Sequence, residues 1–266
     1  MQRRSPYPRV RSAWPGAIAS ETLKLLSLRS NRILLVVALV MIAGAGTLLS
    51  IATVGRLSDE RFAGQEISAT PEMFVDAVLW AQIVIVVLAV LAVVNEYTSG
   101  QVTLSLLAAP TRLPWLGAKA LVLALSGFLV GVIGTAVSFG VSALVVVGTE
   151  VRYEIAFGDA ALLSMKSGLY LAVIAVLAIG VAALVRHVVA ALVAVLALIV
   201  VLPPVLASIP GIGAAADFLP TIAGRRLISD FETAVQLSPW AGFGVLAAWT
   251  ALALALSGAL LAARDA

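Results

Sequence analysis

The chain has 266 residues, of which 62% are hydrophobic and 12% are charged. A soluble domain is about 45–50% apolar and about 25% charged, so one water-soluble core cannot bury this much apolar surface. The formal net charge is only +3, and the sequence contains no cysteine. Composition therefore assigns the chain to the membrane class and excludes a disulfide framework and thiolate metal sites.

Long apolar runs recur along the chain and are separated by short polar segments. A helix needs about 20 apolar residues to cross the roughly 30 Å of hydrocarbon in a bilayer. Six runs meet this requirement, and the third is longer than a bilayer needs, so we expect it to tilt or to extend beyond the membrane. They cover residues 33–54, 77–94, 116–147, 161–185, 188–209 and 239–262. The sequence thus predicts an all-α membrane protein with a six-span transmembrane domain over residues 33–266.

Lysine and arginine are distributed unevenly between the two sides of the predicted spans. If the N-terminus lies in the cytoplasm, eleven of the 17 basic residues fall on the inner side, and eleven of the 14 acidic residues fall on the outer side. Because basic residues are retained on the cytoplasmic side of a membrane, this asymmetry predicts cytoplasmic N- and C-termini. The segment between the second and third spans then faces the cytosol.

Residues 1–32 precede the first span and change character near Gly16. In the second half of this segment, Leu and Ile residues fall between Glu21, Lys24 and Arg29. This pattern is typical of a basic amphipathic helix that lies in the membrane interface. A basic flank without fixed structure is the alternative, but the run from Ala17 to Leu28 contains no Pro or Gly, which favours the helix. We expect a cytosolic tail followed by an N-terminal interfacial amphipathic helix.

The third span contains Gly127 and Gly131 in a GxxxG pattern, with Gly134 one helical step further. Small residues let transmembrane helices approach closely, so we expect a helix–helix contact at these glycines. The pattern does not distinguish a contact within one subunit from a contact between two.

The chain offers little material for catalysis or metal binding. Glu96 falls at the inner end of the second span, Asp76 and Lys166 fall near outer ends, and His187 is the only histidine. One histidine without cysteine does not build a typical transition-metal site, and no nucleophile with a partnered base is visible. No G-x-x-x-x-G-K-[ST] loop occurs, so ATP-driven work would need another chain. We predict a protein that is not an enzyme, holds no metal or cofactor and binds no nucleic acid.

The polar segment between the second and third spans carries a recognisable pattern. It reads NEYTSGQVTLSLLAAPTRLPW, with an acid and an aromatic residue, a glycine four residues after the acid, Pro-x-Arg, and a lysine that opens the next span. This pattern and the six-span layout resemble ABC-2 type exporter permeases, although Gln101 stands where threonine is usual. The residues that carry the resemblance are Glu96, Tyr97, Gly100, Gln101, Pro110, Arg112 and Lys119.

The resemblance implies the transmembrane subunit of an ATP-driven exporter in the bacterial plasma (inner) membrane. A short cytosolic coupling helix between spans 2 and 3 would dock on a separate ABC ATPase subunit, which binds ATP and Mg²⁺, and the N-terminal helix would also contact that subunit. Two permease subunits, identical or different, and two ATPase subunits would form the working unit, surrounded by membrane lipid. The apolar spans suggest efflux of an amphipathic or hydrophobic cargo: a drug-like compound, a peptide antibiotic or a lipid.

Other interpretations of the same residues stay open. Gly100 allows a sharp reversal and Pro110 ends a short apolar helix, as a coupling element needs. Alternatively these residues only terminate two spans, and for Lys119 alone that is the better interpretation. A secondary transporter or channel that works without an ATPase, and an immunity or sensor protein, are the alternative functions. Residues 210–238 form either a partly re-entrant segment or an exposed loop.

Overall fold

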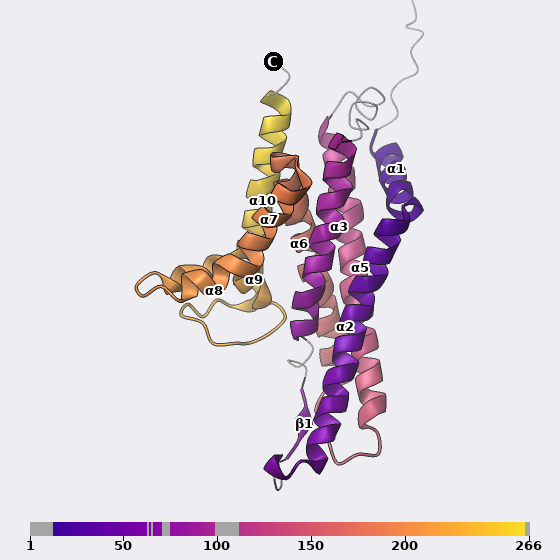
Figure 1. Ribbon diagram of the computed structural model, residues 1–266, viewed down its shortest axis with the longest axis vertical. Helices are drawn as coiled ribbons and strands as arrows, with labels where there is room; N and C mark the ends of the chain where they lie inside the picture. The colour runs from indigo at the N-terminus through magenta and orange to yellow at the C-terminus, as the bar shows by residue number, and fades with distance from the viewer. Residues whose placement is uncertain (1–12, 63, 65, 71–74, 99–111, 264–266) are drawn as a thin grey trace, which may run out of the picture.

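The computed structural model describes residues 13–62, 64, 66–70, 75–98 and 112–263, and helices account for most of them. Five long helices run along the long axis of the molecule (Figure 1). They are α2 (Arg29–Gly55), α3 (Val75–Thr98), α5 (Arg112–Val146), α6 (Phe157–Val185) and α10 (Pro239–Ala263). The described part of the chain is therefore an all-α bundle.

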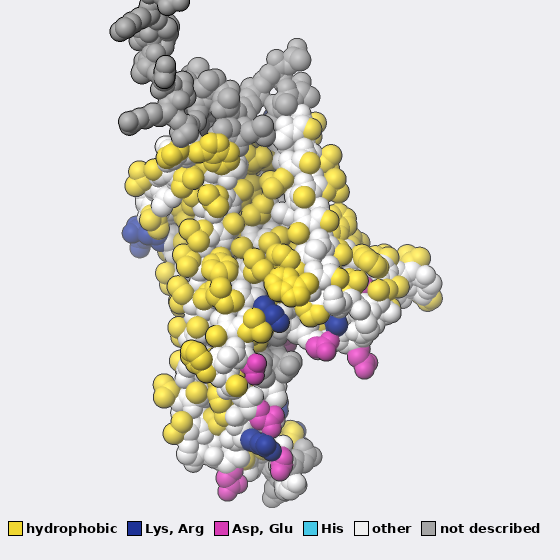
Figure 2. Space-filling model, turned by 180° about the vertical axis from the view of Figure 1, so that it is seen from behind, with side chains coloured by type: hydrophobic (Ala, Val, Ile, Leu, Met, Phe, Trp, Pro, Cys, Tyr) yellow, Lys and Arg dark blue, Asp and Glu magenta, His cyan; other side chains and the backbone are white. Residues whose placement is uncertain are grey.

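Among the described residues, six helices are long and apolar enough to cross a membrane, and their ends agree with the predicted spans to within four residues. Figure 2 shows one face of the bundle covered with apolar side chains, while charged side chains gather toward the end opposite α1. This surface suits a multi-pass membrane protein, because lipid tails solvate apolar side chains. The six segments are Arg29–Ser58, Asp76–Tyr97, Trp115–Val146, Phe157–Val185, Val188–Ala207 and Pro239–Leu260.

A helix precedes the first span, as the sequence predicted. It is α1 (Ala13–Ser27), and it packs against α5 and the start of α2. Leu28 has extended backbone angles (φ −76°, ψ 120°) and separates the two helices. Arg29, which the sequence placed in the helix before the span, is therefore the first residue of α2. α1 lies at the same end of the bundle as the last turn of α3 and the start of α5 (Figure 1).

The predicted glycine motif lies at a contact within this chain. A Cβ on Gly131 would come within 2.6 Å of Gly168 Cα in α6, and a Cβ on Gly127 would come within 2.9 Å of the Leu171 carbonyl oxygen. Gly134 faces the other way, and a Cβ added to it would lie 3.0 Å from Ile42 Cβ of α2. The small residues thus let α5 pack tightly against both α6 and α2.

The fifth span is bent rather than straight. It consists of α7 (Val188–Leu196), the π-helical turn η4 (Ala197–Val201) and α8 (Leu202–Ala207). Pro203 and Pro204 follow closely after the π-helical turn. Proline has no N–H group to donate and its ring crowds the preceding turn, which explains the change in helical pitch at this place. Figure 1 shows α8 directed sideways from the bundle.

The segment after the fifth span is packed against the bundle, and so it is more than an exposed loop. It contains η5 (Gly213–Phe218) and α9 (Pro220–Arg225). A Cβ on Gly224 would lie within 2.7 Å of Leu246 and 2.8 Å of the Tyr170 ring. Only a glycine allows α9 to approach α6 and α10 this closely.

The end of the bundle opposite α1 extends beyond the other helices. There α2 and α5 run past the first turn of α3 (Figure 1). α5 has 35 residues, which at 1.5 Å per residue is about 50 Å, longer than the roughly 30 Å of hydrocarbon. Short 3₁₀ turns η1 (Arg56–Ser58) and η2 (Glu60–Phe62) and a parallel pairing close this end. The paired strands are β1 (Ser68–Ala69) and β2 (Arg152–Tyr153).

Candidate functional site

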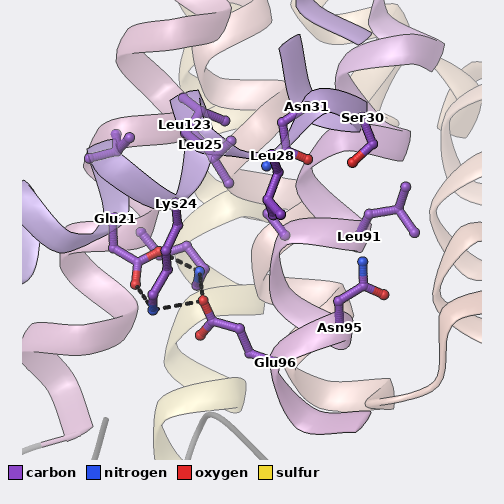
Figure 3. Close-up of a pocket in the computed structure, with 13 residues that line it drawn as sticks. Glu21, Lys24, Leu25, Leu28, Ser30, Asn31, Leu91, Asn95, Glu96 and Leu123 are labelled. Carbon is purple, nitrogen blue, oxygen red and sulfur yellow. Dashed lines mark hydrogen bonds and ion pairs between the residues drawn. The ribbon is translucent and has the colours of Figure 1, made fainter. Parts of the chain in front are cut away.

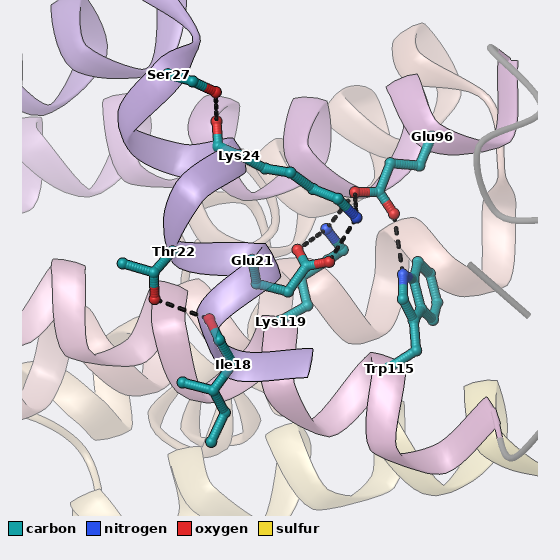
Figure 4. A network of polar contacts seen from close by, with 8 residues as sticks. All are labelled: Ile18, Glu21, Thr22, Lys24, Ser27, Glu96, Trp115 and Lys119. Carbon is teal, nitrogen blue, oxygen red and sulfur yellow. Dashed lines mark hydrogen bonds and ion pairs between the residues drawn. The ribbon is translucent and has the colours of Figure 1, made fainter. Parts of the chain in front are cut away.

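Four charged side chains from three helices form a closed ring at the α1 end of the bundle (Figure 4). Lys24 Nζ lies 2.7 Å from Glu21 Oε1 and 2.9 Å from Glu96 Oε1. Lys119 Nζ lies 2.5 Å from Glu21 Oε2 and 2.9 Å from Glu96 Oε1. Each ammonium thus bridges both carboxylates. We call Glu21, Lys24, Glu96 and Lys119 the charge ring.

The helices place these side chains by simple spacing. Glu21 and Lys24 are three residues apart in α1 and therefore share one face of that helix. Glu96 lies in the last turn of α3, and Lys119 lies two turns into α5. Trp115, one turn before Lys119, donates its indole Nε1–H to Glu96 Oε2 over 2.9 Å. The ring therefore fastens α1 to the ends of α3 and α5.

Most of the charge ring is buried. Glu21 and Glu96 are each 5% exposed and Lys119 is 2% exposed, whereas the Lys24 side chain retains 30% of its accessible surface. Burying an ion costs several kcal/mol unless partners replace its water. Here all four carboxylate oxygens accept at least one hydrogen bond, and the two positive charges equal the two negative ones. The ring is stable as a set, and removal of one member leaves a buried charge unpaired.

Lys24 lies outside the membrane-spanning segments and keeps its charge. Burial would lower the pKa of its ammonium, but the hydrogen bonds and negative charges of Glu21 and Glu96 outweigh burial and raise that pKa above 10.5. Lys24 is therefore protonated throughout the physiological pH range.

Aromatic side chains extend the network toward the turn between α6 and α7. Tyr97 and Trp115 meet edge to face, with ring centroids 6.0 Å apart, and the Arg186 guanidinium lies 5.1 Å from the Tyr97 ring centroid. Arg186 ends α6 with a left-handed backbone (φ 58°). His187 then caps α7, accepting a hydrogen bond from the Ala190 N–H at 3.4 Å. The only histidine thus serves as a helix cap in a short turn.

The structure brings together some of the residues that the sequence singled out and separates others. Glu96, Tyr97 and Lys119 gather around the ring with Glu21 and Lys24, whereas Arg29 is exposed at the start of α2. Lys119 does more than terminate a span, because α1 covers it and both carboxylates bind it. Arg112 is the first residue of α5, and its side chain is outside the description. The predicted coupling helix lies outside the described residues, together with Gly100, Gln101 and Pro110.

Sequence reasoning missed two features of this site. It interpreted Glu21 and Lys24 as charges of an interfacial helix, and it assigned no role in this site to Trp115. The spacing of Glu21 and Lys24 on one helical face, and of Trp115 and Lys119 on another, was the signal for a shared polar contact. Nothing in the spacing shows that the two faces meet, because that depends on the direction of α1.

The geometry favours a mechanical role for the ring over a chemical one. Its carboxylates are held by ammonium groups and the Trp115 indole, and no group of three metal-ligating side chains occurs among the described residues. No protein-family model matches the sequence, and comparison with curated proteins finds no match either. The ring joins three helices next to the segment between the second and third spans.

Proposed function

We propose that this chain is the transmembrane permease subunit of an ATP-driven ABC exporter. A separate ABC ATPase subunit would bind ATP and Mg²⁺, and this chain would move an amphipathic or hydrophobic cargo out of the cytoplasm. The observation that supports the proposal is the charge ring, which fastens α1 to the last turn of α3 and to the start of α5, the helices on either side of residues 99–111.

A motor subunit that docks on α1 and residues 99–111 would move three helices together. Ionic groups that are buried and hydrogen bonded separate only at a cost of several kcal/mol, so α1, α3 and α5 respond as one unit. From Lys119 the displacement passes along α5 to Gly131, which touches Gly168 of α6. A displacement of α1 by the ATPase would thereby be transmitted through α5 to α6.

The spans suit a cargo with little charge. Between Asp76 and Glu96, α3 contains no ionisable residue, and α10 contains none at all. The polar pair buried between α3 and α6 is neutral, because the Tyr170 hydroxyl donates to Gln82 Oε1 at 2.6 Å. Ion coupling would use ionisable groups in the middle of the spans, and their absence from the middle of α3 and from α10 supports an external energy source over a proton or sodium gradient.

The proposed working unit contains two permease subunits and two ATPase subunits in a bacterial inner membrane. The excess of Lys and Arg on the α1 side of the spans supports cytoplasmic termini, which would put the ring and residues 99–111 within reach of a cytosolic ATPase.

Co-purification and ATP turnover test the proposal. The chain is co-expressed in turn with each ABC ATPase encoded by the source organism, and complexes are isolated through a tag on this chain. We expect one ATPase to co-purify and its turnover to depend on this chain. Glu96→Gln should leave the complex intact but reduce turnover several-fold, because α1 and the α3–α5 ends no longer move together.

Lys166→Gln is the matched control, because Lys166 is a half-buried charge near the opposite end of α6, far from the ring. It should leave turnover unchanged. If no ATPase co-purifies, or if proteoliposomes with this chain alone transport cargo, the exporter proposal is wrong and an autonomous transporter takes its place.

A further inference from the structure

A pocket of about 280 Å³ opens beside the charge ring, between α1, the first turn of α2, α3 and α5 (Figure 3). Lys24 and Glu96 form part of one wall, and Leu28, Ser30 and Asn31 form another. We call this space the α1 pocket. The ring explains the charged wall, but it does not explain the polar groups at the start of α2.

The N-terminus of α2 lies at this pocket without a cap. Its N-cap position is held by Leu28, whose side chain has no oxygen, and no side chain caps the helix. The first turn of an α-helix has N–H groups without intrahelical partners and carries the positive end of the helix dipole. The first turn of α2 therefore offers N–H donors to a negatively charged group.

Asn31 gives an independent indication of a ligand. It is 5% exposed, it lines the α1 pocket, and its carboxamide forms no hydrogen bond with any other residue in the described part of the chain. A ligand in the pocket would supply the missing partner.

The charges around the α1 pocket favour an anion. Each ring ammonium uses two of its three N–H donors on carboxylates, so Lys24 has a donor left and is the most exposed ring member. The negative charge of Glu21 and Glu96 is offset by the two lysines. Arg29 and Arg32 add two exposed positive charges in the first turn of α2. The remaining N–H donor of Lys24 and the positive charges of Arg29 and Arg32 both favour binding of a phosphate group.

The remaining walls are apolar, which indicates a ligand with hydrocarbon chains. Leu25, Leu91 and Leu123 line the pocket on the other sides. Beyond the pocket, α2 exposes Ile33 and Val36, with 50% and 59% of their surfaces accessible. A free phosphate ester would leave these surfaces unused, whereas acyl chains would cover them.

We propose that the α1 pocket binds the phosphate headgroup of an anionic phospholipid from the adjacent leaflet. The first-turn N–H groups of α2, the Asn31 carboxamide and the Lys24 ammonium hold the phosphate, and the acyl chains lie against α2. This inference requires only that the chain resides in a membrane and does not rest on the exporter proposal. Because the site shares Lys24 with the ring, the lipid also stabilises α1 against α3 and α5.

Native mass spectrometry of the detergent-purified full chain tests the site. The chain is titrated with phosphatidylglycerol and, separately, with phosphatidylcholine of the same acyl chains. We expect tighter binding of phosphatidylglycerol. Asn31→Leu removes the carboxamide at similar volume and leaves the ring intact, and it should weaken phosphatidylglycerol binding roughly tenfold, as does Lys24→Gln, because each loses a hydrogen bond to a charged group.

Lys166→Gln removes one positive charge elsewhere and should leave the affinity unchanged, which controls for general charge. Glycerol 3-phosphate in millimolar excess should fail to displace the lipid, and displacement at equal concentration would identify a free phosphate ester instead and overturn the lipid assignment. Equal affinity for the two lipids, or unchanged affinity in both Asn31→Leu and Lys24→Gln, would overturn the site itself. Neither result bears on ATPase binding, which is measured separately.

Discussion

Lys119 of α5 and Glu21 of α1 are 98 positions apart in the chain, and their charged groups meet at 2.5 Å in a buried site. Glu96 of α3 binds the same ammonium at 2.9 Å. The contact joins the helix before the first span to the helices that flank residues 99–111. Its energetics are open to direct measurement, because each member of the ring can be removed alone or with a partner.

The first prediction concerns the coupling within the ring. Glu96→Gln and Lys119→Met should each lower the free energy of unfolding by about 3–5 kcal/mol, because each leaves the buried ring with one charge that is no longer balanced. The double variant should cost clearly less than the sum, since it removes both charges. Unfolding in detergent, followed by circular dichroism, measures this. Additive losses would show that the two side chains are energetically independent.

The second prediction concerns the contact of α5 with α6. Gly131→Ala should lower the free energy of unfolding by about 1–3 kcal/mol, because the new methyl group meets the backbone of Gly168 at 2.6 Å. Gly140→Ala, in the same helix, has no atom within 4 Å of the new Cβ and serves as the control. It should be neutral or slightly stabilising. The two melting temperatures, measured side by side, give the comparison, and equal values would contradict this packing.

The third prediction concerns the polar pair inside the bundle. Tyr170→Phe removes the hydroxyl that donates to Gln82 Oε1. Hydrogen bonds between transmembrane helices contribute about 0.6 kcal/mol on average and at most about 1.7, so a loss in this range is expected. Gln82→Leu should cost less when combined with Tyr170→Phe than when made alone. A double-mutant cycle measures the difference, and a coupling energy of zero would argue against the bond.

The fourth prediction concerns the pH dependence of the contact made by Lys24. Its pKa is raised above 10.5 in the folded chain, so its contribution to stability is complete below that value and is lost as the pH rises through the folded-state pKa. The melting temperatures of the wild type and Lys24→Gln should differ by a constant amount from about pH 7 to about pH 10 and converge above it. A difference that shrinks already near neutral pH would contradict a raised pKa.

Much of the fold follows from the sequence, because transmembrane helices obey local rules. An apolar run of about 20 residues must form a helix to satisfy its backbone in lipid, so the span at Asp76–Tyr97 could be located without knowing its neighbours. The long third run indicated the length of α5, and Gly131 indicated a close contact. The partner of that contact, Gly168, does not stand out in the sequence, because the glycines of α6 are ten or more residues apart and form no GxxxG pattern.

The candidate site was harder to predict for a physical reason. Lys119 and Glu96 are close in the sequence-based layout, since both border the same short segment. Glu21 joins them because α1, which ends one residue before α2 begins, packs against α5. Burial of Glu21 is thus a property of the angle between two helices, which depends on tertiary packing. Asn31 is hidden from sequence analysis for the same reason.

The charge ring also imposes an order on biogenesis. Glu21 and Lys24 leave the ribosome well before Glu96 and Lys119, so α1 is synthesised while the groups that will surround its carboxylate do not yet exist. Until the third span is inserted, Glu21 must stay in water or at the headgroups, since an unpartnered carboxylate is costly in an apolar setting. The first helix of the described chain is consequently among the last to reach its final position. It can dock only after the first three spans have assembled with their side chains in the correct register.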